Sequence, residues 1–143
     1  MAKLKKTITI DAPVEDVFGF ISEPANLVEI WPSMVEAKDV QRLPNGGSSF
    51  RWVYKMAGIR LEGFSEDTEV VPNERVVSET KDGIESTIKW MCRPKAGGTE
   101  VTFEAEYKVP VPVLGKVAEA FIVKANEGES ELLLANLKAR MEV

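Results

Sequence analysis

Proton-transfer chemistry in this chain would fall to tyrosine and glutamate, because none of its 143 residues is histidine and only Cys92 is a cysteine. Histidine is the commonest general base and the commonest metal ligand near neutral pH. Its absence excludes serine–histidine and cysteine–histidine nucleophiles. With a single cysteine, it also argues against a zinc or copper site. We therefore expect neither a metal nor a cofactor.

The polar side chains available for such chemistry come from separate parts of the sequence. Tyrosine and a buried glutamate can exchange protons without histidine when their surroundings shift their pKa values. The available set is Tyr54, Tyr107 and Glu129, with Ser86 and Asn136 as further polar groups. No spacing singles out a pair among them, so the elements that carry them decide whether they meet.

Composition places the chain among ordinary globular proteins, with 44% hydrophobic and 29% charged residues. The length predicts one domain over residues 1–143. The net charge of −5 argues against nucleic acid or an anionic membrane as the main partner. No apolar run approaches the roughly 18 residues of a transmembrane segment, and Thr7, Thr9 and Asp11 interrupt any signal peptide. We expect a cytoplasmic protein.

The predicted elements are a strand, two short helices, six strands and one long helix. Residues 3–10 alternate between polar and apolar, as in a strand with one buried face. Pro13 begins the first helix, and the second helix, 25–30, ends before Pro32. Turn signals separate the later elements, which we expect at 34–43, 48–57, 59–71, 75–81, 84–93, 99–109 and, for the helix, 113–141. The prediction is an α+β fold, with a seven-stranded antiparallel sheet curved around the long helix.

Large apolar side chains gather on one face of three predicted strands. Alternation places on that face the following residues: Phe50, Trp52, Tyr54, Met56, Trp90, Phe103 and Tyr107. Rings at a spacing of two are core residues more often than ligand contacts. On the strand 59–71, we expect the acidic residues to lie on the solvated side: Glu62, Glu66, Asp67 and Glu69.

The long helix indicates a cavity rather than a filled core. Helical periodicity defines an inward stripe made of Leu114, Ala118, Phe121, Ala125 and Leu132. Glu129 and Asn136 fall inside this stripe, and Gly128 lies at its edge. Small residues leave volume opposite the rings of the sheet, and a buried carboxylate needs a hydrogen-bonding partner. The alternative is that curvature of the helix turns Glu129 toward solvent.

The beginning of the chain resembles the START-like helix-grip superfamily, which includes polyketide cyclase/dehydratase-like proteins and the birch-pollen allergen family. The resemblance rests on the segments 8–18 (ITIDAPVEDVF) and 21–26 (ISEPAN) and on Trp31–Pro32, and its layout covers the whole chain. It implies a cavity between sheet and helix that takes lipids, sterols, polyketides or other apolar molecules. The metal-binding oxygenases of the superfamily need histidine ligands, so that branch is excluded.

The leading prediction is a protein that binds a small apolar molecule. Its expected ligand contacts are Trp31, Phe50, Trp52, Tyr54, Met56, Trp90, Phe103, Tyr107, Phe121, Ala125 and Glu129. By resemblance, an alternative is a cyclase- or dehydratase-type enzyme with Glu129 and Tyr107 as its acid–base pair. Another alternative is an adaptor with a protein partner, which would use the apolar, proline-containing segment 109–114.

Overall fold

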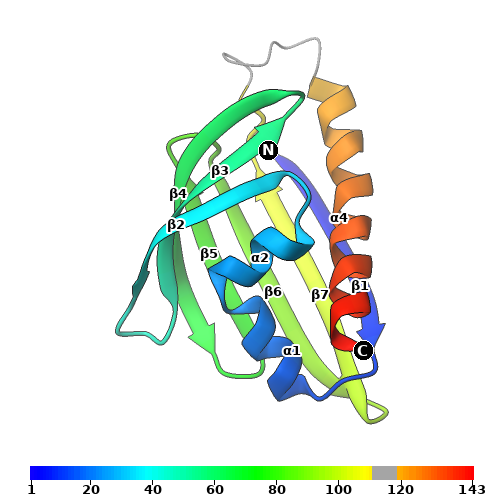
Figure 1. Cartoon of the computed structure of the whole chain (residues 1–143). Helices are drawn as coiled ribbons and strands as arrows, with labels where there is room; N and C mark the ends of the chain where they lie inside the picture. Colours follow the sequence, from blue (N-terminus) through cyan, green and yellow to red (C-terminus); the bar gives the residue numbers. More distant parts are fainter. Residues whose placement is uncertain (111–118) are drawn as a thin grey trace.

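The computed structural model describes residues 1–110 and 119–143, and its elements follow the predicted order (Figure 1). They are β1 (Ala2–Ile10), α1 (Val14–Ile21), α2 (Pro24–Ile30), β2 (Met34–Arg42), β3 (Ser48–Met56), β4 (Ile59–Val71), β5 (Arg75–Lys81), β6 (Ser86–Lys95), β7 (Gly98–Tyr107) and α4 (Glu119–Met141). No helix among these residues is long and apolar enough to cross a lipid bilayer.

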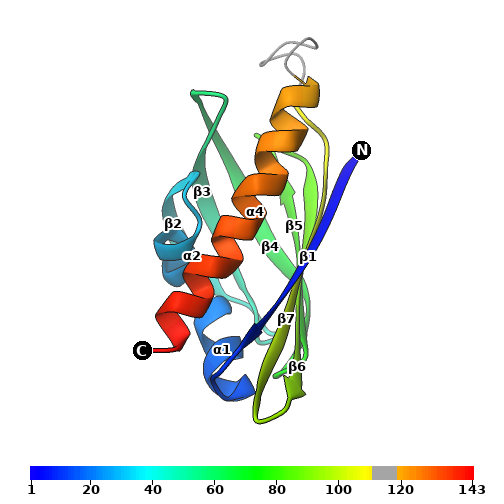
Figure 2. The ribbon, with the colours of Figure 1, turned by 90° about the vertical axis from the view of Figure 1, so that its right-hand side faces the viewer.

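The strands form one seven-stranded sheet in the order β1-β7-β6-β5-β4-β3-β2. Every neighbouring pair is antiparallel. The sheet curves, and α4 lies over it beside β1, while α1 and α2 cover the same side (Figures 1 and 2). This arrangement confirms the predicted α+β helix-grip architecture.

The β6–β7 hairpin lies slightly off its predicted bounds because its turn is tighter than expected. Strand pairing continues to Lys95 and Gly98, so only Ala96 and Gly97 form the turn. Both have a positive φ, of 49° and 85°, as two-residue hairpin turns that match the strand twist require. In the predicted C-terminal helix, residues 113–118 lie outside the described residues.

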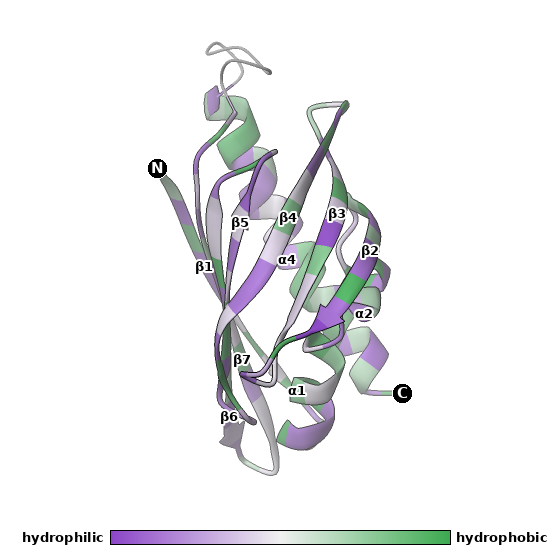
Figure 3. Cartoon of the chain, turned by 90° about the vertical axis from the view of Figure 1, so that its left-hand side faces the viewer, coloured by the Kyte–Doolittle hydropathy of each residue, from purple (hydrophilic) through white to green (hydrophobic). Residues whose placement is uncertain are grey.

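Burial alternates along the strands as the sequence pattern predicts. In β1 the even-numbered residues are more buried than their odd-numbered neighbours, and hydrophilic and hydrophobic residues are mixed along the sheet in Figure 3. On the inner face, Phe50, Trp52, Trp90 and Phe103 are all buried in one cluster with α1 and α4. The sheet therefore presents its rings to the helices.

The predicted inward stripe of α4 was wrong at three positions, while its Leu114 and Ala118 lie outside the described residues and Glu129 does face inward. Phe121 and Leu132 are 72% and 49% exposed, and Ala125 is exposed as well. The inner face instead carries the apolar residues Ile122, Leu133, Leu134 and Leu137, together with the polar residues Asn126, Glu129 and Ser130. Because polar residues interrupt the inner face and apolar ones lie on the outer face, hydropathy alone does not mark the inner side.

Adjacent leucines on α4 test this orientation. Leu133 is completely buried, whereas Leu132 is half exposed. We expect Leu133→Ala to lower the free energy of unfolding by about 2–5 kcal/mol, because it leaves a cavity in the core. Leu132→Ala should change it by less than about 0.5 kcal/mol. Urea denaturation of both variants measures the difference, and equal losses would contradict the observed helix face.

Candidate functional site

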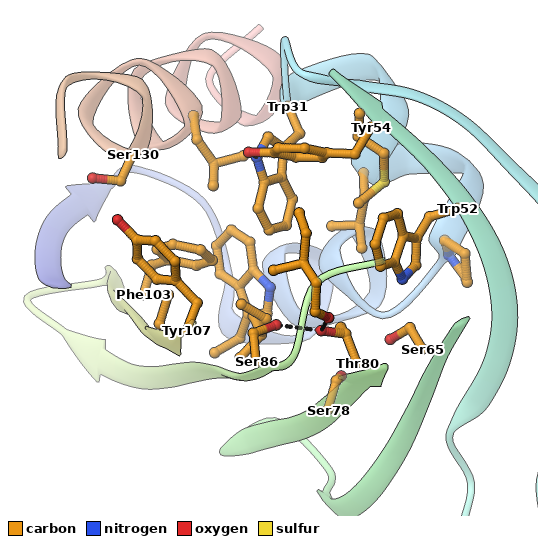
Figure 4. Close-up of a pocket in the computed structure, with 18 of the residues that line it drawn as sticks. Trp31, Trp52, Tyr54, Ser65, Ser78, Thr80, Ser86, Phe103, Tyr107 and Ser130 are labelled. Atoms are coloured by element: carbon orange, nitrogen blue, oxygen red, sulfur yellow. Dashed lines mark hydrogen bonds between the residues drawn. The ribbon is translucent and has the colours of Figure 1, made fainter. Parts of the chain in front are cut away.

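A cavity lies between the curved sheet and α4 (Figure 4). Its volume is about 120 Å³. Sites for drug-sized ligands typically have roughly 300–1,000 Å³. The cavity in the described conformation is therefore smaller than such sites, and a ligand of that size would require lining side chains to move.

Nine of the eleven predicted ligand contacts line this cavity: Trp31, Phe50, Trp52, Tyr54, Met56, Trp90, Phe103, Tyr107 and Glu129. Phe121 and Ala125 do not, because they lie on the exposed face of α4. Of the further polar candidates, Ser86 lines the cavity. Asn136 does not line it, and its side-chain amide donates a hydrogen bond of 3.0 Å to the carbonyl oxygen of Ile30.

Trp31 is central to the aromatic wall of the cavity. It follows directly after α2, because Pro32 disfavours helical geometry at the preceding residue. Its ring stands edge-on to the rings of Tyr54 and Phe103, with centroids 6.1 and 5.5 Å away. Edge-to-face contacts of this kind stabilise aromatic pairs. They join α2, β3 and β7 around one side of the cavity.

Glu129 meets Tyr54 and Ser33, and no hydrogen bond joins it to its predicted partner Tyr107 among the described side chains. The Glu129 carboxylate accepts hydrogen bonds from the Ser33 backbone N–H (3.1 Å) and the Ser33 hydroxyl (2.5 Å). It also accepts one from the Tyr54 hydroxyl (3.4 Å), which in turn accepts one from Trp31 Nε1 (3.3 Å). Three donors therefore satisfy this carboxylate, as a partly buried charge requires.

Both tyrosines of the cavity favour the neutral phenol. Burial raises the pKa of Tyr54, and the neighbouring negative charge of Glu129 raises it further. Burial also raises the pKa of Tyr107, and the nearby negative charge of Glu127 adds to this shift. At neutral pH these hydroxyls therefore act as hydrogen-bond donors and acceptors, and neither is set up as a base.

Sequence reasoning named Ser86 and Tyr107 but missed Ser65 and Thr80, which complete a row of hydroxyl groups across the cavity wall. Strand register places Ser65 on β4 opposite Thr80 on β5, Thr80 opposite Ser86 on β6, and Ser86 opposite Tyr107 on β7. All four line the cavity. In Figure 4, Ser65, Ser78, Thr80 and Ser86 lie on the opposite side of the cavity from Trp31 and Tyr54. The sequence signal for this row was the recurrence of small polar residues two positions apart, which places their side chains on the same face of a strand.

The prediction that Asp67 lies on the solvated side of its strand was wrong. Asp67 is buried and lines the cavity, because β4 turns Ser65 and Asp67 inward. Its carboxylate accepts hydrogen bonds from the Ser48 backbone N–H (2.8 Å) and the Ser78 hydroxyl (2.6 Å). Burial raises the pKa of Asp67, and these two hydrogen bonds oppose the shift.

Trp52 lies against two glycines at the end of the cavity. A Cβ atom on Gly63 would lie 2.2 Å from Cζ2 of the Trp52 ring, and one on Gly83 would lie 3.0 Å from the same ring. The ring therefore occupies the space that side chains would take at these positions. Trp52 Nε1 and the Tyr107 hydroxyl are buried and have no hydrogen-bond partner among the described residues.

The charged groups of the cavity wall are all acidic. Glu129 and Asp67 line it, and within residues 1–110 and 119–143 no lysine or arginine does. Neither carboxylate forms a salt bridge with a described residue. The same part of the chain contains no group of three or more acidic or cysteine side chains placed to hold a metal ion.

The hydrogen bonds of Glu129 predict a measurable coupling with Ser33. We expect Glu129→Gln to lower the free energy of unfolding by about 1.5–3 kcal/mol, because hydrogen bonds to a charged acceptor are lost. Combining it with Ser33→Ala should give a coupling energy of about 0.5–3 kcal/mol in a double-mutant cycle. The control is Glu131→Gln on the exposed face of α4, with an effect below about 0.5 kcal/mol. Additive losses would contradict the contact.

A family model described as polyketide cyclase / dehydrase and lipid transport matches residues 1–142. No curated protein sequence is similar enough to match the chain. Among solved structures, the protein TTHA0849 from Thermus thermophilus is 22% identical, with a TM-score of 0.76, over 97% of this chain and 96% of that one. A START superfamily protein from Mycobacterium smegmatis is 18% identical, with a TM-score of 0.75, over 99% and 98%.

A further neighbour is the di-domain ARO/CYC protein StfQ from the steffimycin biosynthetic pathway. It is 17% identical, with a TM-score of 0.77, over 99% of this chain and 50% of StfQ. Identities this low show a shared fold, and a fold does not determine a function. The family model, in contrast, spans nearly the whole chain. The chain therefore belongs to the polyketide cyclase / dehydrase and lipid transport family and has its START-like, helix-grip fold.

Proposed function

We propose that the protein binds a small, mainly apolar molecule in the cavity between the sheet and α4. The observation that carries the proposal is the cavity itself, which is walled by the rings of Trp31, Trp52, Tyr54 and Phe103. Apolar pockets with a few convergent polar groups are the usual form of a small-molecule site. The family assignment supports the same function, since its description includes lipid transport.

The polar groups of the cavity support binding more than catalysis. Glu129 accepts three hydrogen bonds from its own chain, and Tyr54 is held in its neutral form. A general base needs a free lone pair within reach of the substrate proton. The likeness to ARO/CYC structures keeps a cyclase- or dehydratase-type reaction as an alternative. In such a reaction, the available base would be the second lone pair of Glu129 Oε2, because this oxygen accepts only the Ser33 hydroxyl.

A protein partner is a second alternative, favoured by one observation on α4. Phe121 and Leu132 are exposed apolar residues on the same outer face of the helix, and exposed apolar patches often mark contact surfaces. The segment 109–114, in which we expected a docking surface, lies mostly outside the described residues. Val109 at its start is buried.

The native mass of gently purified protein is the first test of the proposal. We expect a bound molecule to add mass under native conditions and to be absent under denaturing conditions, because the contacts that hold it are noncovalent. Extraction into organic solvent then identifies its class. A ligand lost in purification leaves no extra mass, so a direct binding measurement accompanies this one.

A cavity-filling variant makes that binding measurement specific. Ala105 lines the cavity on β7, and its neighbour Glu106 is exposed on the opposite face. We expect Ala105→Phe to weaken binding of the neutral probe N-phenyl-1-naphthylamine at least about tenfold, because the new ring takes the probe's space. Glu106→Phe should change the Kd by less than about twofold. Fluorescence titration measures both, and equal affinities would place the probe outside the cavity.

A further inference from the structure

We propose that the cavity selects its ligand by charge, and that it takes uncharged, ring-bearing molecules and rejects their anionic counterparts. This inference rests on the proposed binding function and adds a ligand class to it. It derives from the distribution of charged, hydroxyl and aromatic groups around the cavity. Free carboxylates, sulfonates and phosphates are the chemical groups that the site would exclude.

The first step of the argument is the negative charge of the wall. Glu129 on α4 and Asp67 on β4 line the cavity from two sides. Their hydrogen-bond donors are Ser33 and Tyr54 for Glu129 and Ser48 and Ser78 for Asp67, all of which are uncharged groups. Hydrogen bonds from neutral donors stabilise a carboxylate without cancelling its charge. A ligand anion in the same cavity would meet this charge at reduced dielectric, where repulsion is stronger than in water.

The second step is the lack of a countercharge for a ligand anion. Sites for carboxylates and phosphates usually present arginine, lysine or a helix N-terminus. Across the described residues, the side chains that line the cavity include no arginine and no lysine. Lys6 on β1 and Lys138 on α4, neither of which lines the cavity, pair with Glu131 and Glu142. An anion would therefore lose its hydration without gaining an ion pair.

The third step is what the wall offers to a neutral ligand. The rings of Trp31 and Tyr54 face the hydroxyl row across the cavity (Figure 4). Ser65 lines the cavity, and Trp52 Nε1 and the Tyr107 hydroxyl, which line it too, are buried without a hydrogen-bond partner among the described residues. Hydroxyl and indole N–H groups suit the oxygen atoms of ketones, ethers and phenols. A flat, uncharged molecule fits between rings on one side and hydroxyls on the other.

The test compares two probes that share one body and differ in a sulfonate. N-phenyl-1-naphthylamine is uncharged, and 8-anilino-1-naphthalenesulfonate is its anionic counterpart. We expect the neutral probe to bind the protein at least about tenfold more tightly in fluorescence titrations. Ala105→Phe should weaken its binding, which assigns the signal to the cavity.

Neutralising the wall should restore binding of the anion. We expect Glu129→Gln to tighten the sulfonate's Kd at least about fivefold relative to the neutral probe's Kd. Glu131→Gln removes the same charge on the exposed face of α4 and should leave the ratio of the two Kd values unchanged. If Glu129→Gln proves unstable, Asp67→Asn is the second variant, with the same expected direction. A sulfonate excluded only by its size would stay excluded in both variants, which would overturn the proposal.

The outcomes separate this proposal from the proposed function. If the two probes bind with equal affinity, displace one another and both lose binding in Ala105→Phe, charge selection is overturned. Ligand binding in the cavity then still stands. Failure of both probes to bind would contradict the proposed function as well. A preference for the neutral probe that disappears in Glu129→Gln, but not in Glu131→Gln, supports the proposal.

Discussion

The hydrogen bonds that tie α4 to α2, to the segment after α2 and to β3 are the constraint on which the cavity depends. Glu129 binds Ser33 after α2 and Tyr54 on β3, and Asn136 binds the Ile30 carbonyl. Hydrophobic attraction is non-directional, so a purely apolar helix would move inward until the volume was filled. Hydrogen bonds are satisfied only over a narrow range of distance and angle. They therefore fix the helix at one distance from the sheet.

The polar side of the cavity is also compatible with a stable fold. Buried polar groups are tolerated where they find partners, and Asp67 with Ser48 and Ser78 forms such a set. Thr80 likewise donates to the Ile84 carbonyl at 2.7 Å. An unsatisfied buried polar group costs about 1–3 kcal/mol. Most of the hydroxyl wall avoids that cost without a ligand, so the cavity can persist when empty.

Local sequence patterns predicted the strands well, because the alternation of apolar and polar residues and the turn residues can be recognised within a few positions of the chain. The face of β3 with Phe50, Trp52 and Tyr54 followed directly from this period of two. The inner face of α4 did not, since Phe121 and Leu132 face solvent, although Glu129 of the same predicted stripe does line the cavity. Asp67 was misplaced for the same reason. Its burial depends on Ser78 and Ser48, which come from other strands and are not visible in a local pattern.

These two failures have a common physical meaning. Where inward positions are polar, the interior cannot gain the free energy that a continuous apolar core supplies at about 25 cal/mol per Å². A chain keeps such positions at the cost of stability, and departures from local consistency are expected at functional sites. Glu129 and Asp67 line the same cavity from opposite elements. Hydropathy misplaced Asp67, whereas the inward stripe already contained Glu129. These two carboxylates distinguish this interior from an ordinary core, and they give the cavity its charge.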